Sequence, residues 1–307
     1  MNATRRTGIL LALATATISG VSVFVNGFGV KAFANATVYT TAKNMVAAVI
    51  LIALVGLGAR AGAHLTRPTG RGQWVALAAI GIIGGSVPFV LFFEGLARAS
   101  SPQASFIHKT LVLWVALLAL PLLKERLNWG HWLAIGLLVV GQVGLAGGPP
   151  SSFGAPGLMI LAATVLWSLE VIVAKRLLTG VSSWTVGVAR MGCGSVALLG
   201  WLAIRGQIGA MTSLTGEQLG WALLTGVLLA GYVATWFAAL ARAQAVDVTA
   251  VLVLAVPVTA GLNAAANGTA LAPQASWLTM VVLGGALVAW LGWRRSPSAV
   301  VADEGQA

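Results

Sequence analysis

The chain has 307 residues, of which 58% are hydrophobic and only 8% are charged, and its mean hydropathy is +0.93. Soluble domains average about half apolar and about a quarter charged residues, so water is excluded as the main solvent of this chain. The formal net charge of +11 comes from Lys and Arg residues that stand singly or in pairs between apolar blocks. Because they form no basic stripe, they indicate membrane topology and not nucleic-acid binding.

The apolar residues run in unbroken blocks of about 20, the length at which an α-helix crosses a hydrocarbon core. Transmembrane strands would instead alternate apolar and polar residues in segments of about ten, and the sequence has no such alternation. We therefore predict an all-α membrane protein whose ten transmembrane helices lie in the lipid bilayer. They are expected at residues 8–30, 37–57, 74–95, 102–123, 130–147, 156–177, 183–204, 218–240, 246–267 and 276–293.

The Lys and Arg residues between the predicted helices are distributed unevenly over the two sides of the membrane. Twelve of them fall on the side of the N-terminus, and only Lys31, Arg98 and Arg205 fall on the other side. Positively charged loops stay in the cytoplasm. We therefore expect a multi-pass protein of the inner membrane with both termini in the cytoplasm.

A short sequence repeat divides the chain into two halves. The segment FEGLARA at residues 93–99 recurs as FAALARA at residues 237–243, at the end of the third predicted helix of each half and 144 residues later. Because each half has five helices, an odd number, the second copy enters the membrane upside down, which predicts two inverted repeats. We expect the repeats at residues 1–148 and 156–295, followed by a polar tail at 296–307.

Five ionisable residues lie more than one turn from either end of a predicted helix, where a charge costs about 2.5 to 3.5 kcal/mol and requires compensating surroundings. They are Lys43, His108, Lys109, Glu170 and Arg190. The first three lie at similar depth, which predicts a cationic outer vestibule. The last two lie on neighbouring helices, which predicts an ion pair between them.

Two interpretations of these residues stay open. In one, both lysines snorkel to the interface, the Glu170–Arg190 pair only joins two helices and His108 is a packing residue. In the other, the excess of cations binds a substrate that carries a carboxylate or phosphate, and His108 takes part in proton coupling. Trp114 and Trp167, expected near mid-span, are further candidates for substrate contact, with core packing as the alternative.

Two prolines are candidate hinges. Pro88 in the third predicted helix and Pro257 in the ninth each remove a backbone hydrogen bond and favour a kink. The sequence contains no phosphate-binding glycine loop, metal-binding His cluster or nucleophilic triad, and Cys193 is its only cysteine. We therefore expect no cofactor, no metal site and no enzymatic activity.

Residues 92–145 combine a step of small residues into the fourth predicted helix, the segment LKERL at 123–127 and a glycine-rich fifth helix. This stretch resembles the EamA-type half of the drug/metabolite transporter superfamily, and the resemblance extends over both halves, including Trp167 and Arg190. It implies ten helices in two inverted repeats around a central cavity. It also implies export of a small-molecule substrate, such as an amino acid or another carboxylated metabolite.

The second half departs from this pattern, because residues 268–270 read GTA where residues 124–126 of the first half read KER. The two ends of the transport pathway are therefore expected to differ chemically. Two alternatives to a transporter are a membrane-embedded enzyme that uses His108 and Glu170, and a membrane sensor that transports nothing. The sequence leaves the oligomeric state open.

Overall fold

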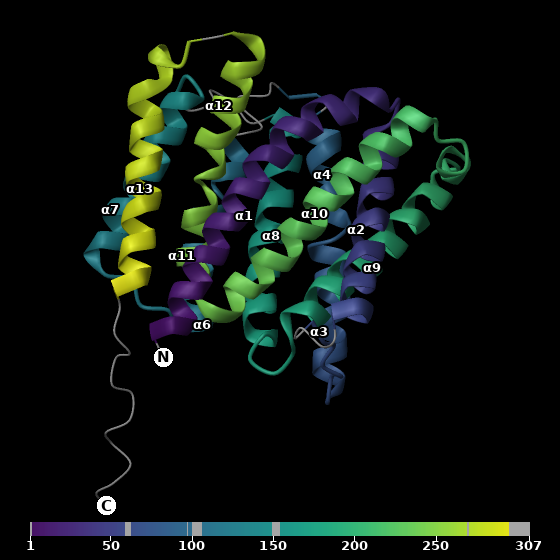
Figure 1. The fold of residues 1–307 in the computed structure, drawn as a ribbon, viewed down its shortest axis with the longest axis horizontal. Coiled ribbons are helices and arrows are strands. Elements are labelled where there is room, and N and C mark those ends of the chain that lie inside the picture. Colours follow the sequence, from purple (N-terminus) through teal and green to yellow (C-terminus); the bar gives the residue numbers. More distant parts are fainter. Residues whose placement is uncertain are drawn as a thin grey trace, which may run out of the picture.

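The computed structural model describes residues 2–58, 63–96, 98–99, 106–148, 154–268 and 270–294. Over these residues the chain is a bundle of helices that run side by side (Figure 1). Among the described residues, nine helical spans are long and apolar enough to cross a membrane, and α7 (Trp129–Leu145) is a shorter apolar helix of 17 residues. Each predicted segment therefore corresponds to a helix, although α7 falls short of the roughly 20 residues of a typical span.

The helices are bounded as follows. The first half contains α1 (Asn2–Gly29), η1 (Val30–Ala32), α2 (Ala36–Gly58), α3 (Arg71–Ile83), α4 (Val87–Leu96), α6 (Leu111–Leu123) and α7. The second half contains α8 (Gly154–Leu177), α9 (Ser183–Ile204), η3 (Ile208–Met211), α10 (Gly216–Arg242), α11 (Ala245–Leu252), α12 (Ala255–Asn267), η4 (Ala272–Gln274) and α13 (Ala275–Arg294).

The third predicted helix is interrupted where its proline removes a hydrogen-bond donor. It divides into α3 and α4 at residues 84–86, just before Pro88. Pro88 has no N–H group for the carbonyl oxygen of Gly84 four residues earlier. That oxygen instead accepts a hydrogen bond from Trp167 Nε1 of α8, at 3.1 Å. The interruption thus anchors the two helices of one repeat to the first helix of the other.

The ninth predicted helix is interrupted in a similar way, at Val253 and Leu254 between α11 and α12. Pro257 follows, and the carbonyl oxygen of Val253 accepts the N–H of Val256 at 3.0 Å instead. In the fourth helix a turn at Thr110 precedes α6. Residues 106–109 before this turn are helical, whereas residues 102–105, which include Pro102, lie outside the described residues.

Two structural features recur at the 144-residue offset of the sequence repeat. The turn at Thr110 is matched by the turn that includes Leu254. Helix α6 is followed directly by Lys124, which has φ 53° and ψ 32°, and α12 is followed directly by Gly268, which has φ 62° and ψ 24°. Both residues are left-handed C-caps, a conformation that glycine adopts without strain and lysine does not.

The packing of the helices is reciprocal between the halves. Helix α1 packs against α10 as α8 packs against α4, and α2 packs against α10 as α9 packs against α3. Helix α1 also packs against α12 as α8 packs against α6, while α2 contacts α9 and α7 contacts α13. This is the pattern expected of two similar units related by a twofold axis, because each contact then occurs twice or lies on the axis.

The start of α1 and the end of α13 lie at the same end of the bundle (Figure 1), which we call the N-terminal end. The guanidinium carbon of Arg6 is 5.1 Å from the ring centroid of Trp293. The α1–α2 and α9–α10 connections meet each other, since Asn35 Nδ2 donates to Gln207 Oε1 at 2.9 Å. These contacts agree with the alternation of loops expected from the distribution of Lys and Arg.

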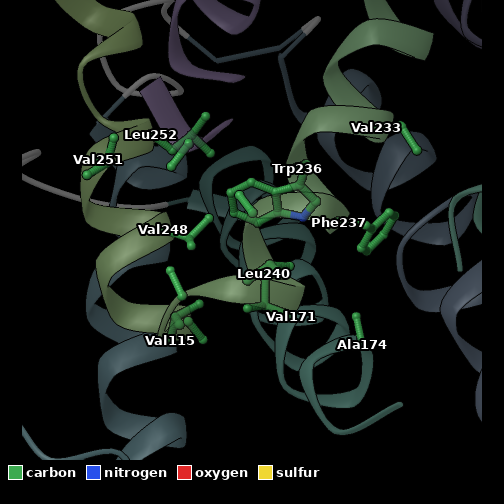
Figure 2. Packing of buried hydrophobic residues seen from close by; sticks show 14 of the residues in the cluster. Val115, Val171, Ala174, Val233, Trp236, Phe237, Leu240, Val248, Val251 and Leu252 are labelled. Atoms are coloured by element: carbon green, nitrogen blue, oxygen red, sulfur yellow. The ribbon is translucent and has the colours of Figure 1, made fainter. Parts of the chain in front are cut away.

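Buried apolar side chains fill the space where α6, α8, α10 and α11 meet (Figure 2). Trp236, Phe237 and Leu240 of α10 are at most 4% exposed, and Val171 of α8 and Val248 of α11 pack with them. Inside lipid the hydrophobic effect does not drive helices together, so close packing of this kind holds them. The core fixes α8, α10 and α11 relative to one another and thereby positions the polar residues described next.

Candidate functional site

An ion pair buried between α8 and α9 joins Glu170 and Arg190, as the sequence predicted. Arg190 Nε donates to Glu170 Oε1 at 2.5 Å, and Arg190 Nη2 donates to Oε2 at 3.3 Å. Both residues are at most 6% exposed. Gly84, at the α3–α4 interruption, leaves room for the pair, because a Cβ atom there would overlap the carboxyl group of Glu170. The α3–α4 interruption therefore packs directly against the ion pair.

Lys43 lies in an aromatic cage. Its Nζ atom is 4.9 Å from the ring centroid of Tyr39, 5.3 Å from that of Phe93 and 5.9 Å from that of Phe89. It donates one hydrogen bond, to Asn26 Oδ1 at 2.9 Å. Lys43 is only 5% exposed, and it has no carboxylate within ion-pair distance among the residues that the structure describes. Its ammonium group is thus buried in the bundle and does not snorkel.

One aromatic ring connects this cage to the ion pair. The guanidinium carbon of Arg190 is 5.8 Å from the ring centroid of Phe89, the same ring that Lys43 approaches. Cations near an aromatic face gain about 0.5 to 2 kcal/mol, with the larger values where they are desolvated. The two cations and Glu170 therefore belong to a single site, formed by α2, α4, α8 and α9, that carries one net positive charge when all three groups are ionised.

The aromatic wall of the site continues through Trp167 to His108. The ring centroid of Trp167 is 5.4 Å from that of Phe89, 5.6 Å from that of Phe92 and 5.0 Å from that of His108. His108 Nδ1 is buried and has no hydrogen-bond partner in the described part of the chain. Trp167 and His108 thus extend the site as an amphipathic aromatic surface. His108 Nδ1 is the nitrogen of this surface that makes no hydrogen bond within the described residues.

The two remaining predicted site residues, Lys109 and Trp114, lie apart from this cluster. Trp114 Nε1 donates to Thr110 Oγ1 one turn earlier in the chain, at 3.1 Å. Lys109 lines a separate small cavity beside α7. The predicted vestibule of Lys43, His108 and Lys109 is therefore divided, with the first two at the aromatic site and the third elsewhere.

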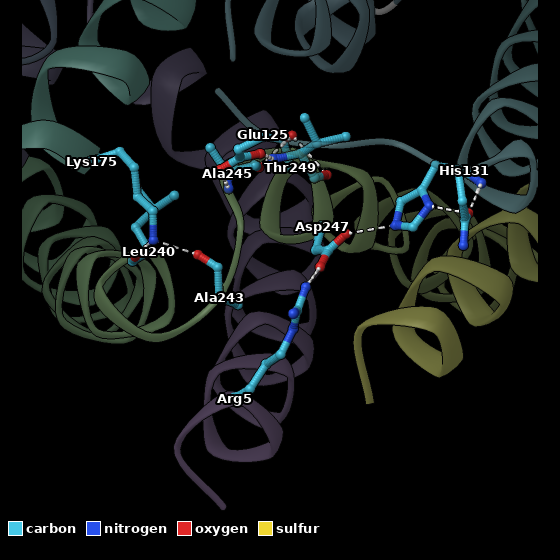
Figure 3. A network of polar contacts seen from close by, with 11 residues as sticks. Arg5, Glu125, His131, Lys175, Leu240, Ala243, Ala245, Asp247 and Thr249 are labelled. Carbon is cyan, nitrogen blue, oxygen red and sulfur yellow. Dashed lines mark hydrogen bonds and ion pairs between the residues drawn. The ribbon is translucent and has the colours of Figure 1, made fainter. Parts of the chain in front are cut away.

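A second polar network ties the two halves together at the N-terminal end (Figure 3). Asp247 of α11, which is fully buried, accepts a hydrogen bond from Arg5 of α1 at 2.8 Å and lies 3.2 Å from Nε2 of His131 of α7. Nδ1 of His131 lies 2.5 Å from Oδ1 of Asn128, which also caps the start of α7. Side chains from α1 and α7, two helices of the first half, thus contact the same carboxylate of the second half.

The same region contains Glu125, between α6 and α7. Its carboxylate accepts the backbone N–H groups of Ala245 and Val246, at 2.6 and 3.1 Å. These are the first two residues of α11, so Glu125 binds the positive end of that helix. Burial raises the pKa of Glu125 above its ordinary value, while the two N–H bonds and the nearby ammonium group of Lys175 act in the opposite direction. We call Arg5, Glu125, His131 and Asp247 the latch.

Lys175 of α8 lies beside the latch and satisfies the end of the preceding helix. Its Nζ atom donates to the carbonyl oxygens of Leu240 and Ala243, at 2.5 and 2.6 Å (Figure 3). These carbonyls belong to the last turn of α10 and the residue that follows it, and they lack helical partners. The short connection from α10 to α11 is thereby held in place.

Sequence reasoning did not select several residues of these two sites. Asn26, Tyr39, Phe89 and Phe93 carry no charge, so only their position beside Lys43 reveals them. Asp247 could have been selected from the sequence, because it is a carboxylate at the start of the predicted ninth helix. Among the described residues there is no group of three or more His, Cys, Asp or Glu side chains that could hold a metal ion.

The helical spans, with charged residues buried between them, define an integral membrane protein with a polar site inside its bundle. The sequence profile of the EamA-like transporter family matches this chain twice, at residues 6–147 and at residues 155–291. The chain therefore belongs to the EamA-like transporter family, has its two-repeat architecture and falls within the drug/metabolite transporter superfamily, as the sequence resemblance suggested.

A comparison of folds gives the same architecture. A solved structure described as "Crystal structure of protein" has a TM-score of 0.74 and 19% sequence identity, and the match covers 92% of this chain and 98% of that chain. At this identity the likeness concerns the fold alone. No curated protein sequence matches the chain significantly.

Proposed function

We propose that this protein is a secondary transporter or facilitative exporter of the inner membrane, and that its substrates are amino acids or related small metabolites with a carboxylate group. The observation that carries the substrate class is Lys43, a cation buried in an aromatic cage without a carboxylate partner among the described residues. A substrate carboxylate would supply the missing counter-charge. Hydrogen bonds to charged groups contribute about 1.5 to 3 kcal/mol, enough to select such substrates.

The charges around Lys43 support this proposal. Arg190 is offset by Glu170, at 2.5 Å, whereas Lys43 has only the neutral oxygen of Asn26. A buried charge is expensive unless it is paired. The free site therefore favours an anionic or zwitterionic ligand over a cationic one.

The aromatic wall supports a second property of the substrate. Phe89, Phe93 and Trp167 present large apolar faces within the same cluster as Lys43 and Arg190. Aromatic and apolar groups pack well against such faces, and aromatic pairs gain about 0.5 to 1.5 kcal/mol beyond buried area. Among amino acids, we expect those with large apolar or aromatic side chains to be preferred.

For the mechanism we propose alternating access by two inverted repeats, residues 1–148 and 156–295, that rock around the site. The reciprocal helix packing is what such a relation requires. The latch closes the N-terminal end, which we assign to the cytoplasm, so its contacts must separate whenever that end opens. The interruptions next to Pro88 and Pro257 are suited to act as hinges, since few backbone hydrogen bonds oppose bending there.

An enzymatic role for His108 and Glu170 gains little from the geometry. Both residues lie near Trp167, but the carboxylate of Glu170 is bound by Arg190, and no hydrogen bond joins it to His108. A general acid or base must reach the substrate proton that it transfers, and the bonds to Arg190 occupy the carboxylate of Glu170. Transport by the family fold remains the function that the site supports best.

A counterflow assay in proteoliposomes tests the proposal. Proteoliposomes that contain the purified protein are loaded with unlabelled amino acids, their decarboxylated amines or other carboxylic acids. Uptake of the labelled counterparts into these vesicles is then measured. We expect flux for carboxylated compounds only. Replacing Lys43 with Gln should lower this flux by roughly 10- to 100-fold, the equivalent of about 1.5 to 3 kcal/mol.

The matched control is Lys31→Gln, which removes an exposed lysine outside the cage and should leave flux unchanged. Lys43→Arg keeps the charge and should retain part of the activity. Equal flux of the amines and the amino acids, or full activity of Lys43→Gln, would overturn the proposed substrate class.

A further inference from the structure

An open pocket of about 670 Å³ lies at the N-terminal end of the bundle, where α3 begins (Figure 1). It is lined by residues 67–71, which lead into α3, and by Trp74 near the start of that helix. Two of the lining residues are the exposed arginines Arg67 and Arg71. Sites for small ligands have volumes of roughly 300 to 1,000 Å³, so the pocket has room for more than a single ion.

The pocket carries positive charge. Among the described residues, neither Arg67 nor Arg71 forms an ion pair with a carboxylate. Gly70, which precedes α3, provides no side-chain cap, so the start of this 13-residue helix adds its own partial positive charge. The planar guanidinium group of arginine binds phosphate oxygens through two parallel hydrogen bonds. A phosphate group therefore fits this pocket.

The pocket opens onto an exposed apolar stripe of α3. Trp74 is 57% exposed and Val75 is 61% exposed. They follow Arg71 by three and four residues, so all three lie on the same side of the helix. Ala78 and Ile82 continue this exposed stripe along α3. A ligand held by the arginines would thus meet an apolar surface that begins at an indole ring, which is the usual residue at the headgroup level of a membrane.

Hydrogen bonds to the other half hold the chain segment that carries the pocket. The backbone N–H group of Thr66 donates to Thr185 Oγ1 at 2.8 Å, and Thr66 Oγ1 accepts from the N–H group of Ser182 at 3.2 Å. Ser182 Oγ also donates to the carbonyl oxygen of His64 at 2.8 Å. Because these bonds fix the chain just before Arg67, a ligand loses less affinity to the ordering of this segment.

We propose that this pocket binds one anionic phospholipid of the surrounding membrane. Arg67 and Arg71 would contact the phosphate of its headgroup, and its acyl chains would lie along Trp74 and Val75. A soluble phosphate would gain only the first of these contacts, so the exposed apolar stripe favours a lipid. The site is separate from the cage of Lys43, and its test requires neither a substrate nor transport.

The fluorescence of Trp74 can report lipid bound at this position. The purified full-length protein is reconstituted in phosphatidylcholine that contains an increasing fraction of a lipid with brominated acyl chains, which quench indole fluorescence on contact. The brominated lipid is phosphatidylglycerol in one series and phosphatidylcholine in the other. In every background, the signal of Trp74 is the difference between the proteins with and without Trp74→Phe.

Brominated phosphatidylglycerol should quench Trp74 at a lower fraction than brominated phosphatidylcholine. We expect a preference of about fivefold for each arginine, or roughly 25-fold for the two. Arg67→Gln and Arg71→Gln should each lower the preference about fivefold, and the double variant should quench equally with both lipids. Arg242→Gln is the matched control, because it removes an exposed arginine at the same end of the bundle but outside the pocket, and it should keep the wild-type preference.

Two results would overturn the proposal: equal quenching by the two brominated lipids in the wild type, or an equal loss of preference in Arg242→Gln and in the pocket variants. Millimolar inorganic phosphate, added at constant ionic strength, separates a lipid from a soluble anion. Quenching by phosphatidylglycerol should persist, and its reversal by phosphate would assign the pocket to soluble anions instead. The substituted side chains are all exposed, so the variants are expected to fold.

Discussion

The carboxylate of Glu125 accepts the backbone N–H of Ala245 at 2.6 Å, and thereby joins the α6–α7 connection of the first half to the start of α11 in the second. Its other oxygen accepts the N–H of Val246 at 3.1 Å. A negative charge at the N-terminus of a helix is favourable, and both N–H groups would otherwise be unpaired. Glu125 thus caps a helix of the other half, and the proposed alternating access requires its contacts to be lost when the N-terminal end opens.

Replacing Glu125 with Ala should loosen the latch. Each buried N–H group left unpaired costs about 1 to 3 kcal/mol, which shifts an opening equilibrium by roughly fivefold or more. The opening can be measured by maleimide labelling of Val246→Cys in a Cys193→Ser background, since Val246 is fully buried. Labelling should accelerate at least about fivefold.

Glu94→Ala is the control for this labelling experiment. Glu94 forms an exposed pair with Arg98 and has no contact with the latch. An unchanged labelling rate in Glu125→Ala, or an equal acceleration in the control, would show that Glu125 does not hold the N-terminal end closed.

The pH dependence of stability should also depend on Glu125. Because burial raises its pKa, the folded protein holds the proton of Glu125 more tightly than the unfolded chain does. Desolvation thus outweighs the two N–H bonds, and the proton-linked part of the free energy of unfolding is complete below the pKa of the unfolded chain and is lost as the pH rises through the higher pKa of the folded form. Unfolding midpoints of the wild type and Glu125→Gln, measured between about pH 4 and 8, should show a decline with pH that is smaller in the variant.

The control is Glu94→Gln, in which the decline of the wild type should persist. Identical profiles for Glu125→Gln and the wild type would mean that Glu125 does not change its protonation between the folded and unfolded states in this range.

Helix positions were predictable from the sequence because lipid imposes one simple rule on them. A span needs about 20 apolar residues, and among the described residues nine of the ten predicted segments match helices that are long and apolar enough to cross a membrane, while the tenth matches the shorter helix α7. The repeat was visible because the third helices of the two halves end in similar sequences. The partnership of Glu170 and Arg190 followed from the cost of leaving either charge alone in a span.

The faces of the helices were harder to predict. Which residues surround Lys43 depends on how α1, α2 and α4 are rotated about their axes, and uniformly apolar helices carry little periodicity that would fix this rotation. The separation of Lys109 from His108 has the same origin, since adjacent residues on a helix point about 100° apart. Contacts across the halves, such as that of Arg5 with Asp247, depend on the arrangement of two repeats and have no signal in local sequence.

The ion pair at the centre of the site should show strong coupling between its members. Arg190→Met alone leaves the carboxylate of Glu170 buried without a partner, which costs about 3 to 5 kcal/mol. The double variant Glu170→Gln/Arg190→Met removes both charges and should be clearly more stable than the single one. Unfolding of the four proteins of this cycle in detergent gives the coupling energy, and additive effects of the two substitutions would contradict a direct ion pair.

The space that Gly84 leaves for the ion pair can be tested with one methyl group. In Gly84→Ala the new Cβ atom would occupy the position of the Glu170 carboxyl group, so the pair must shift or the α3–α4 interruption must move. Overpacking of this kind costs about 1 to 3 kcal/mol. The unfolding midpoint should fall, and so should counterflow of whichever carboxylated substrate the transport assay identifies.

Gly136→Ala is a matched substitution for this last test. Gly136 lies in α7, and a Cβ atom there would meet no other atom within 4 Å, apart from its own helix backbone and chain neighbours. The substitution should therefore be neutral or raise stability by up to about 1 kcal/mol through helix propensity. Because both variants add the same methyl group to a membrane-embedded segment, any loss confined to Gly84→Ala reports the contact with Glu170. Equal behaviour of the two variants would show that the close approach of the α3–α4 interruption to Glu170 has no bearing on the site.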